Sequence, residues 1–105
     1  MDYCMIMLTT SSKEEAEKIT ALLLENRAVS CMQMMPINSH YHWKGKIEHS
    51  NEILLLCKTT DALYTFAESL IRKNHSYEVP QIIKIPITGG LPEYLNWISQ
   101  ETNKQ

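Results

Sequence analysis

The apolar segments of this chain are hydrophobic on both sides when they are read as β-strands. Successive side chains of a strand point to opposite faces, so a sheet with one face in water alternates apolar and polar residues. Residues 3–8 and 53–57 do not alternate. The opposing sets are Tyr3, Met5 and Met7 against Cys4, Ile6 and Leu8, and Leu54 and Leu56 against Ile53, Leu55 and Cys57. Such strands need cover on both faces of the sheet, which restricts the fold more than any other feature of the sequence.

Signals for helix starts and turns divide the rest of the chain. A capping box of Ser11 with Glu14, or of Ser12 with Glu15, begins a helix with apolar residues at helical spacing, and Asp61 is placed to cap a second helix. The expected strands are residues 3–8, 29–43, 52–59 and 81–87, and the expected helices are about 12–26, 61–75 and 92–98. This β-α-β-β-α-β order with a short C-terminal helix predicts an α+β, ferredoxin-like sandwich, with the whole chain of 105 residues in a single domain.

The segments 29–43 and 52–59 flank the turn signal Lys44-Gly45 and predict a long β-hairpin. The fifteen extended residues of the first arm would span about 50 Å, whereas a globule of 105 residues is only about 33 Å across. Pro36 cannot donate a hydrogen bond to a sheet, so we expect it at an edge position or a bulge. The first arm therefore either bends at Pro36 or projects beyond the domain.

The second apolar face predicts self-association. The two long helices of this fold cover one face of the sheet, so the other face needs a different cover. Another copy of the chain can supply it, and closed symmetry would also pair strand edges that otherwise invite aggregation. The alternative is a monomer whose last helix, residues 92–99, folds over the second face. The pattern alone does not choose between a dimer and a trimer.

Charge and composition exclude several classes of function. The formal net charge is -2 and the basic residues are scattered, so a nucleic-acid partner is not expected. No apolar run approaches the roughly 20 residues of a membrane span, and the first residues lack the positive charge of a signal peptide. The three cysteines form no CxxC pair and fit buried, reduced thiols. We therefore expect a cytoplasmic protein without membrane contact, with residues 102–105 as a solvated tail.

Two groups of residues could carry chemistry. His40 and His42 would point to the same side of a strand and could begin a metal site, although a solvated polar pair is the simpler interpretation. The segment from His75 to Glu78 brings an imidazole, a phenol and a carboxylate into a connection between a helix and a strand, where functional groups are often displayed. In the alternative, His75 only caps the helix dipole and Tyr77 fills the core.

An enzyme is not expected from the motifs. The chain has no Gly-rich phosphate loop, no nucleophile motif and no local metal-ligand signature. The enzymatic alternative is a small hydrolase or transferase in which Cys31, His75 and Glu78 serve as nucleophile, base and orienting group.

One combination of residues extends along nearly the whole chain: Ser30-Cys31, Pro36, Ser39, Tyr41, Trp43, the run from Lys44 to Glu48, Lys58-Thr59, and the segment from His75 to Pro80. This combination resembles the CutA family of divalent-cation tolerance proteins. The resemblance implies a homotrimer packed much as in PII signal-transduction proteins, with long hairpins reaching across subunits. It also implies a role in tolerance of divalent metals, with copper as the first candidate.

The same resemblance implies where a metal would bind. In the family, metal is associated with a thiol at the end of the first strand and two adjacent histidines after the second helix. The corresponding positions here are Thr9, Asn74 and His75, so only one of these ligand types is retained, and Ser76 and Gln81 replace the usual proline and glutamate. The metal candidate is therefore His75.

Two functions from different classes follow from the resemblance. The first is a metal-responsive protein that holds copper, another divalent cation or a small anion in a cleft between subunits. The second is a PII-like signalling or scaffold trimer that binds a protein or a small ligand without metal chemistry. The expected cleft residues are Tyr41, Trp43, Lys44, Glu48, Lys58, Tyr77 and Glu78, together with His75, and Cys31 is a second metal candidate.

Overall fold

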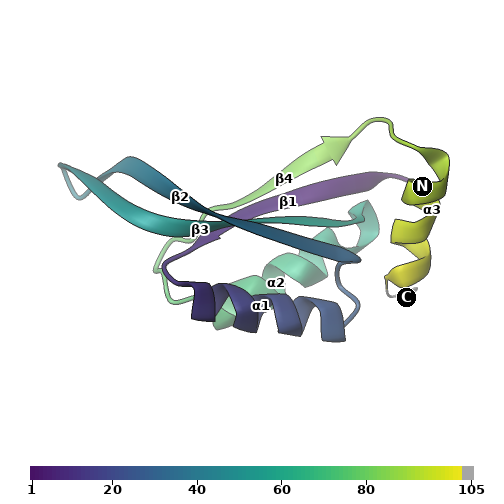
Figure 1. Ribbon diagram of the computed structural model, residues 1–105, viewed down its shortest axis with the longest axis horizontal. Helices are drawn as coiled ribbons and strands as arrows, with labels where there is room; N and C mark the ends of the chain where they lie inside the picture. Colours follow the sequence, from purple (N-terminus) through teal and green to yellow (C-terminus); the bar gives the residue numbers. More distant parts are fainter. Residues whose placement is uncertain (103–105) are drawn as a thin grey trace.

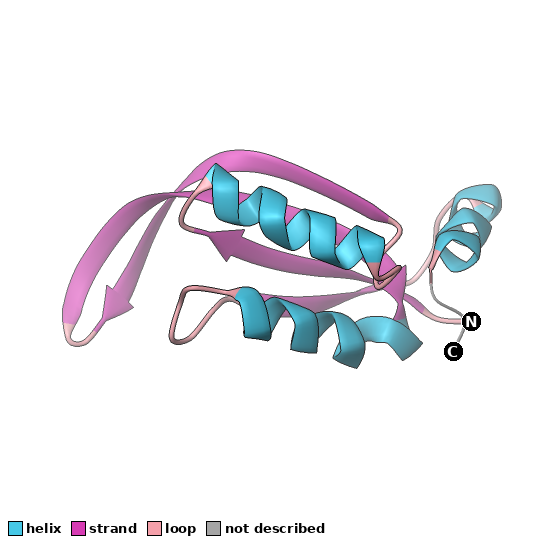
Figure 2. Ribbon diagram, turned by 90° about the horizontal axis from the view of Figure 1, so that it is seen from below, coloured by secondary structure: helices cyan, strands magenta, loops and turns pink. Residues whose placement is uncertain are grey.

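Four strands form one antiparallel sheet, and two helices lie side by side across one of its faces (Figures 1 and 2). The structure, a computed structural model, describes residues 1–102. The strand order β2-β3-β1-β4 is that of the ferredoxin-like class, so the predicted fold is confirmed. The elements are β1 (Tyr3–Thr10), α1 (Lys13–Glu25), β2 (Cys31–Trp43), β3 (Lys46–Thr60), the 3-10 helix η1 (Asp61–Leu63), α2 (Tyr64–Asn74), β4 (Ile82–Ile87) and α3 (Pro92–Glu101).

Helix α1 begins with the second of the two capping arrangements considered. The Ser12 hydroxyl accepts a hydrogen bond from the Glu15 N–H at 3.1 Å. The Glu15 carboxylate reaches back and accepts weaker bonds from the N–H and hydroxyl of Ser11, both at 3.4 Å. These contacts satisfy free N–H groups of the first turn and fix the start of the helix.

The long hairpin has a two-residue turn, and its second arm begins earlier than predicted. Lys44 and Gly45 both have positive φ, 51° and 81°, as a type I′ turn requires. Strand β3 therefore starts at Lys46 rather than at residue 52, because pairing with β2 continues through polar residues that show no strand pattern of their own. The register runs without interruption past Pro36, which lies on the outer edge of the sheet as expected and forms no bulge. The hairpin projects beyond the helices (Figure 1).

The predicted cap of the second helix is wrong. Asp61 lies at the start of the 3-10 helix η1, and no side chain caps either η1 or α2. The Asp61 carboxylate instead pairs with the Lys84 ammonium of β4 at 3.3 Å. The Asp61 side chain therefore joins the second helical segment to the edge of the sheet.

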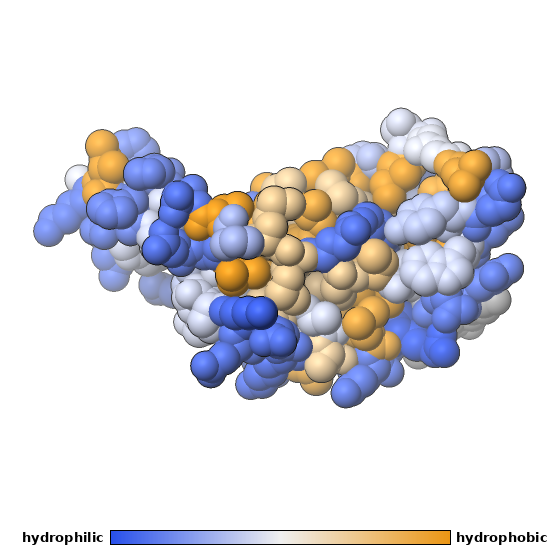
Figure 3. Space-filling model, in the orientation of Figure 1, coloured by the Kyte–Doolittle hydropathy of each residue, from blue (hydrophilic) through white to orange (hydrophobic). Residues whose placement is uncertain are grey.

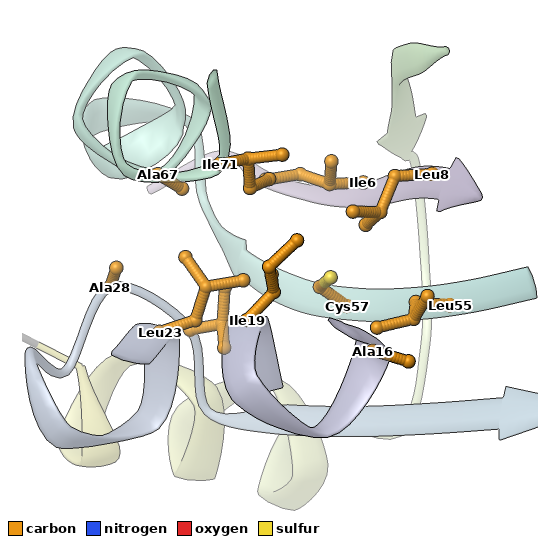
Figure 4. Packing of buried hydrophobic residues seen from close by; sticks show 11 residues of the cluster. Ile6, Leu8, Ala16, Ile19, Leu23, Ala28, Leu55, Cys57, Ala67 and Ile71 are labelled. Atoms are coloured by element: carbon orange, nitrogen blue, oxygen red, sulfur yellow. The ribbon is translucent and has the colours of Figure 1, made fainter. Parts of the chain in front are cut away.

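The hydrophobic core lies between the sheet and helices α1 and α2 (Figure 4). Its side chains come from the helix-facing side of β1 and β3 and from the inner stripe of each helix. The buried cluster is Ile6, Leu8, Ala16, Ile19, Leu23, Ala28, Val29, Leu55, Cys57, Ala67 and Ile71. Since this single cluster uses only one face of each strand, the apolar residues of the other face remain to be explained.

The opposite side of the sheet, which we call the open face, has no helix across it. Its apolar residues include Met5, Met7, Met35, Ile37, Leu54, Leu56, Ile83, Ile85 and Ile87. Helix α3 sits beyond one end of the sheet (Figure 1) and leaves Met35 48% exposed and Ile83 45% exposed. The alternative in which the last helix covers this face is therefore wrong. Figure 3 shows apolar side chains gathered over the strands, between the polar hairpin and the polar helix surfaces.

Thr102, the first residue of the expected solvated tail, is instead buried and hydrogen-bonded. Thr102 is 4% exposed, and its hydroxyl donates to the Ile98 carbonyl oxygen at 3.0 Å. The remainder of the expected tail, residues 103–105, lies outside the described residues.

Candidate functional site

The connection between α2 and β4 folds its imidazole inward. The His75 side chain is fully buried, and its ring packs against that of Tyr77 with centroids 4.8 Å apart. The His75 Nε2 atom lies 2.7 Å from the Thr9 carbonyl oxygen at the end of β1, and the Tyr77 N–H donates to Nδ1 at 3.1 Å. His75 therefore joins the end of α2 to the sheet.

These contacts determine the tautomer of His75 and its capacity to bind metal. Because Nδ1 accepts a hydrogen bond from an N–H, it carries no proton, so Nε2 carries the proton and donates it to Thr9. Both ring nitrogens are then occupied, whereas a metal needs a free lone pair on one of them. Metal binding by His75 within one chain would require at least one of these two hydrogen bonds to break.

Tyr77 ties this connection to the hairpin. Its hydroxyl donates to Glu52 Oε2 at 2.6 Å, and Glu52 is only 7% exposed. Burial and the neighbouring Glu52 carboxylate raise the pKa of Tyr77 above its usual value. The phenol thus stays protonated and serves as a hydrogen-bond donor, which is more than the simple core-filling role considered from the sequence.

Glu15 closes the network from α1. Its Oε2 atom accepts the Ser76 N–H at 2.7 Å and lies 4.0 Å from His75 Nδ1. Burial by itself raises the pKa of Glu15, but the hydrogen bonds that its carboxylate accepts from Ser76 and Ser11 outweigh it, so the pKa is lowered overall. The lowered pKa favours the ionised form of Glu15 beside the connection, in a network with Glu52, His75 and Tyr77.

Thr9, Asn74 and His75, the positions at which the resemblance implies metal ligands, do come together, but they make other contacts. Thr9 supplies its backbone carbonyl to His75, and the Asn74 side chain donates to the Leu70 carbonyl oxygen at 2.8 Å, which caps α2. Neither side chain replaces a thiolate or an imidazole as a soft ligand. The site is built as a set of internal hydrogen bonds.

Cys31 lies at the other end of the sheet. Cys31 pairs with Lys58 of β3, and Lys58 pairs with Met5 of β1. Met5 is four residues from Thr9, which is about 13 Å along β1. Cys31 therefore does not meet His75, and the enzymatic triad of Cys31, His75 and Glu78 is not formed in one chain. Its actual neighbour is Tyr94 of α3, whose pKa is raised by burial and by the Cys31 thiol.

The expected cleft residues divide into three separate places. The first group, at the hairpin tip, is exposed and comprises Tyr41, Trp43, Lys44 and Glu48. Lys58 is ten residues from Glu48, which is about 33 Å along β3. Its ammonium group donates a hydrogen bond to the Gln33 side chain. Tyr77 and Glu78 occupy the connection. Only a second copy of the chain could bring these groups into one cleft.

At the hairpin tip, the aromatic residues make local contacts. The Tyr41 and Ser50 hydroxyl oxygens are 3.3 Å apart, and the Lys44 ammonium sits 5.6 Å from the centre of the Trp43 ring. Trp43 and Tyr41 each remain 41% exposed, which is high for aromatic side chains. They form a surface that is available to a partner.

Sequence reasoning missed three residues. Glu15 and Glu52 are brought to the connection by tertiary packing, for which the sequence carries no local signal. His49 is different, because a two-residue turn at Lys44-Gly45 places it directly opposite His40. That pairing could have been read from the turn alone.

Two absences hold for residues 1–102. No group of three or more His, Cys, Asp or Glu side chains is arranged, as it stands, to hold a metal ion. None of the helices in this part of the chain is both long enough and apolar enough to cross a membrane.

The chain is similar in sequence to proteins of one family. The model of the family described as CutA1 divalent ion tolerance protein matches residues 4–101. The divalent-cation tolerance protein CutA of Archaeoglobus fulgidus is 39% identical over 95 residues, which cover 90% of this chain and 93% of that protein. Protein CutA of Mus musculus is 36% identical over 96 residues, and the chain spans only 54% of its length. Protein CutA of Arabidopsis thaliana is described as chloroplastic. It is 33% identical over 98 residues, which cover 92% of this chain and 54% of that protein.

Solved structures agree with the sequence comparison. CutA1 from Oryza sativa matches with a TM-score of 0.96 at 29% identity, covering 100% of this chain and 97% of that one. The periplasmic divalent cation tolerance protein CutA from Archaeoglobus fulgidus matches with a TM-score of 0.93 at 37% identity, covering 94% and 97%.

Proposed function

This chain belongs to the CutA1 family of divalent ion tolerance proteins, and we propose that it acts in divalent-cation tolerance as a homotrimer closed through its open face. The observation that carries the assembly is the row of half-exposed apolar side chains on that face, including Met35 and Ile83. Monomeric soluble proteins rarely leave a contiguous apolar patch of this kind in water.

The hairpin supports a closed assembly as well. Strand β2 is an outer edge of the sheet, and its distal half extends past the helices with unpaired backbone groups on one side. Pairing these edges around a rotation axis would use them up and prevent open-ended association. The family resemblance favours three copies over two.

The cation would lie in a cleft between subunits. The hairpin tip of one copy, with Tyr41, Trp43 and Glu48, would reach the connection of the next, with Tyr77 and Glu78. Copper is the cation we expect first, because Cu²⁺ forms the most stable complexes of the first-row divalent metals with nitrogen and oxygen ligands. Since both nitrogens of His75 are engaged within its own chain, we assign the exposed carboxylates the leading role in this cleft.

Calorimetric titration of CuCl₂ into the assembled protein tests the cleft. Glu78→Gln removes an exposed carboxylate of the connection and should weaken binding, while Glu25→Gln removes an exposed carboxylate at the C-terminal end of α1 as a control. Equal affinity of the two variants for copper would refute a cleft at Glu78.

A second candidate function is a PII-like signalling or scaffold trimer without metal chemistry. It is favoured by the internally satisfied His75 and by the exposed aromatic tip of the hairpin. A rigid trimer would present three copies of that tip to a partner. Recovery of one partner at fixed stoichiometry, lost with Trp43→Ala, would support this function over the first.

We propose the cytoplasm as the compartment and no catalytic activity. Relatives are described with other compartments, so cell fractionation of the native host is the deciding measurement. Turnover that disappears with Cys31→Ser would overturn the second expectation.

A further inference from the structure

One face of the projecting hairpin carries three of the four histidines of the chain. His40 and His42 stand two residues apart on β2, and His49 is the direct partner of His40 on β3. The His40 and His49 rings stack with centroids 5.6 Å apart and planes at 26°. All three residues are exposed, so no part of the described chain restrains their rings from the solvent side.

The strand geometry fixes how far apart these rings can be. Directly opposite residues have Cβ atoms about 4.5–5.5 Å apart, and diagonal neighbours lie about 7–8 Å apart. His40 and His49 are an opposite pair, and His42 is diagonal to His49. Three imidazoles at these spacings can reach one ion of the usual Zn–N distance, about 2.0–2.1 Å, after rotation of exposed side chains. Such rotations occur in nanoseconds or less.

The surroundings of the three rings favour a cation. The other residues on this face are uncharged: Pro36, Asn38, Ile47, Asn51 and Ile53. The two lysines of the hairpin tip belong to the opposite face, because Lys46 pairs with Trp43 and the Lys44 ammonium lies over the Trp43 ring. A metal ion on the histidine face would thus meet no positive charge from its own hairpin.

We propose that His40, His42 and His49 form a site for one divalent transition-metal ion per chain, with zinc or copper as the preferred ions. Neutral imidazole suits both metals, and three imidazoles with one water complete a tetrahedral zinc site. The stacked His40–His49 pair holds two of the ligands together before the metal arrives, and His42 turns to join them. This site lies on the opposite side of the hairpin from Tyr41 and Trp43, so it is separate from the proposed cleft.

Zinc titration of the assembled protein tests the site. We expect one Zn²⁺ bound per chain, and a loss of affinity of about tenfold or more in His40→Gln and in His49→Gln. Removing even a hydrogen-bond partner of a ligand costs about 10–100-fold in metal affinity, so removing a ligand should cost at least as much. Unchanged affinity in both variants would overturn the proposal.

A composition-matched control separates a built site from general attraction to histidine. The double substitution His40→Tyr/Tyr41→His keeps all residue types but moves one imidazole to the other face of the strand. We expect this variant to lose affinity as His40→Gln does. Zinc affinity equal to the wild type would show that placement on one face is irrelevant and would refute the site.

Side-chain NMR supplies a readout that does not depend on the variants folding well. Zinc should shift the imidazole nitrogen resonances of His40, His42 and His49 and leave those of His75 in place, since His75 is buried and bonded at both nitrogens. Shifts at His75 alone would contradict the hairpin site. Because Glu78→Gln leaves all three hairpin ligands intact, failure of the cleft and failure of this site are measured independently.

Discussion

Replacing Ile83 by aspartate should abolish assembly without unfolding the subunit. Ile83 lies on the edge strand β4 opposite Met7, points to the open face, and is 45% exposed in a single chain. Its helix-facing neighbours Ile82 and Lys84 keep their contacts in the variant. The substitution therefore acts on the surface that we assign to the subunit interface.

The size of the effect follows from the exposed fraction. Full burial of an isoleucine side chain is worth about 1.5–3 kcal/mol, so burying the remaining 45% contributes about 0.7–1.4 kcal/mol per copy and about 2–4 kcal/mol per trimer. Aspartate also places an unpaired charge in the interface, at several kcal/mol per ion. Since each 1.4 kcal/mol is a factor of ten in an equilibrium constant, the variant should not assemble at micromolar concentration.

Sedimentation velocity measures this directly. The wild type should sediment at about 37 kDa, three times the chain mass of 12.2 kDa, and Ile83→Asp at the mass of one chain. Leu24→Asp is the matched control, because Leu24 is 42% exposed on the outer side of α1 and should leave the trimer intact. A wild type that sediments as a stable single chain, or an Ile83→Asp variant that assembles normally, would refute the interface.

Three further predictions concern the connection and the thiols. Tyr77→Phe leaves the buried Glu52 carboxylate without its donor and should lower the free energy of unfolding in urea by about 1–3 kcal/mol, and no change would show that water replaces the phenol. Folding lowers the pKa of Glu15, so its stabilising contribution is present above its ordinary pKa and is lost as the pH falls through the folded value. The stability difference between wild type and Glu15→Gln should accordingly shrink below about pH 4.5, and a constant difference would contradict this sign. Burial raises the pKa of Cys4 to about 11 and of Cys57 to about 12, so mass spectrometry should find neither thiol alkylated by iodoacetamide in the folded protein at pH 8, and rapid labelling of either would be incompatible with that burial.

The order and type of the elements were predictable because their signals are local. Apolar runs, the cap at Ser12 and the turn at Lys44-Gly45 each act over a few residues, and the structure confirms them. The errors arose where tertiary contacts decide the local structure. Residues 46–51 are a strand because β2 lies beside them, and Asp61 turns away from the helix because Lys84 offers a charge partner.

The candidate site was predictable in its residue types and not in its connections. His75 and Tyr77 were identified from the chemistry that they bring to one loop. Their partners, Thr9 and Glu52, lie 66 and 25 residues away along the chain, and no spacing rule links such positions. The bonded state of His75, which decides its availability to metal, follows only from these distant contacts.

The hairpin shows how one local feature controls two surfaces at once. Side chains alternate along a strand, so a one-residue change of register would move His49 to the face of Tyr41. The turn at Lys44-Gly45 sets that register and therefore places the three histidines on one face and the aromatic residues on the other. The aromatic face continues the open face of the sheet, whereas the histidine face continues the side that carries the helices. Subunit contact and metal binding by the three histidines would thus use different side chains of the same ribbon, and neither needs the other to be displaced.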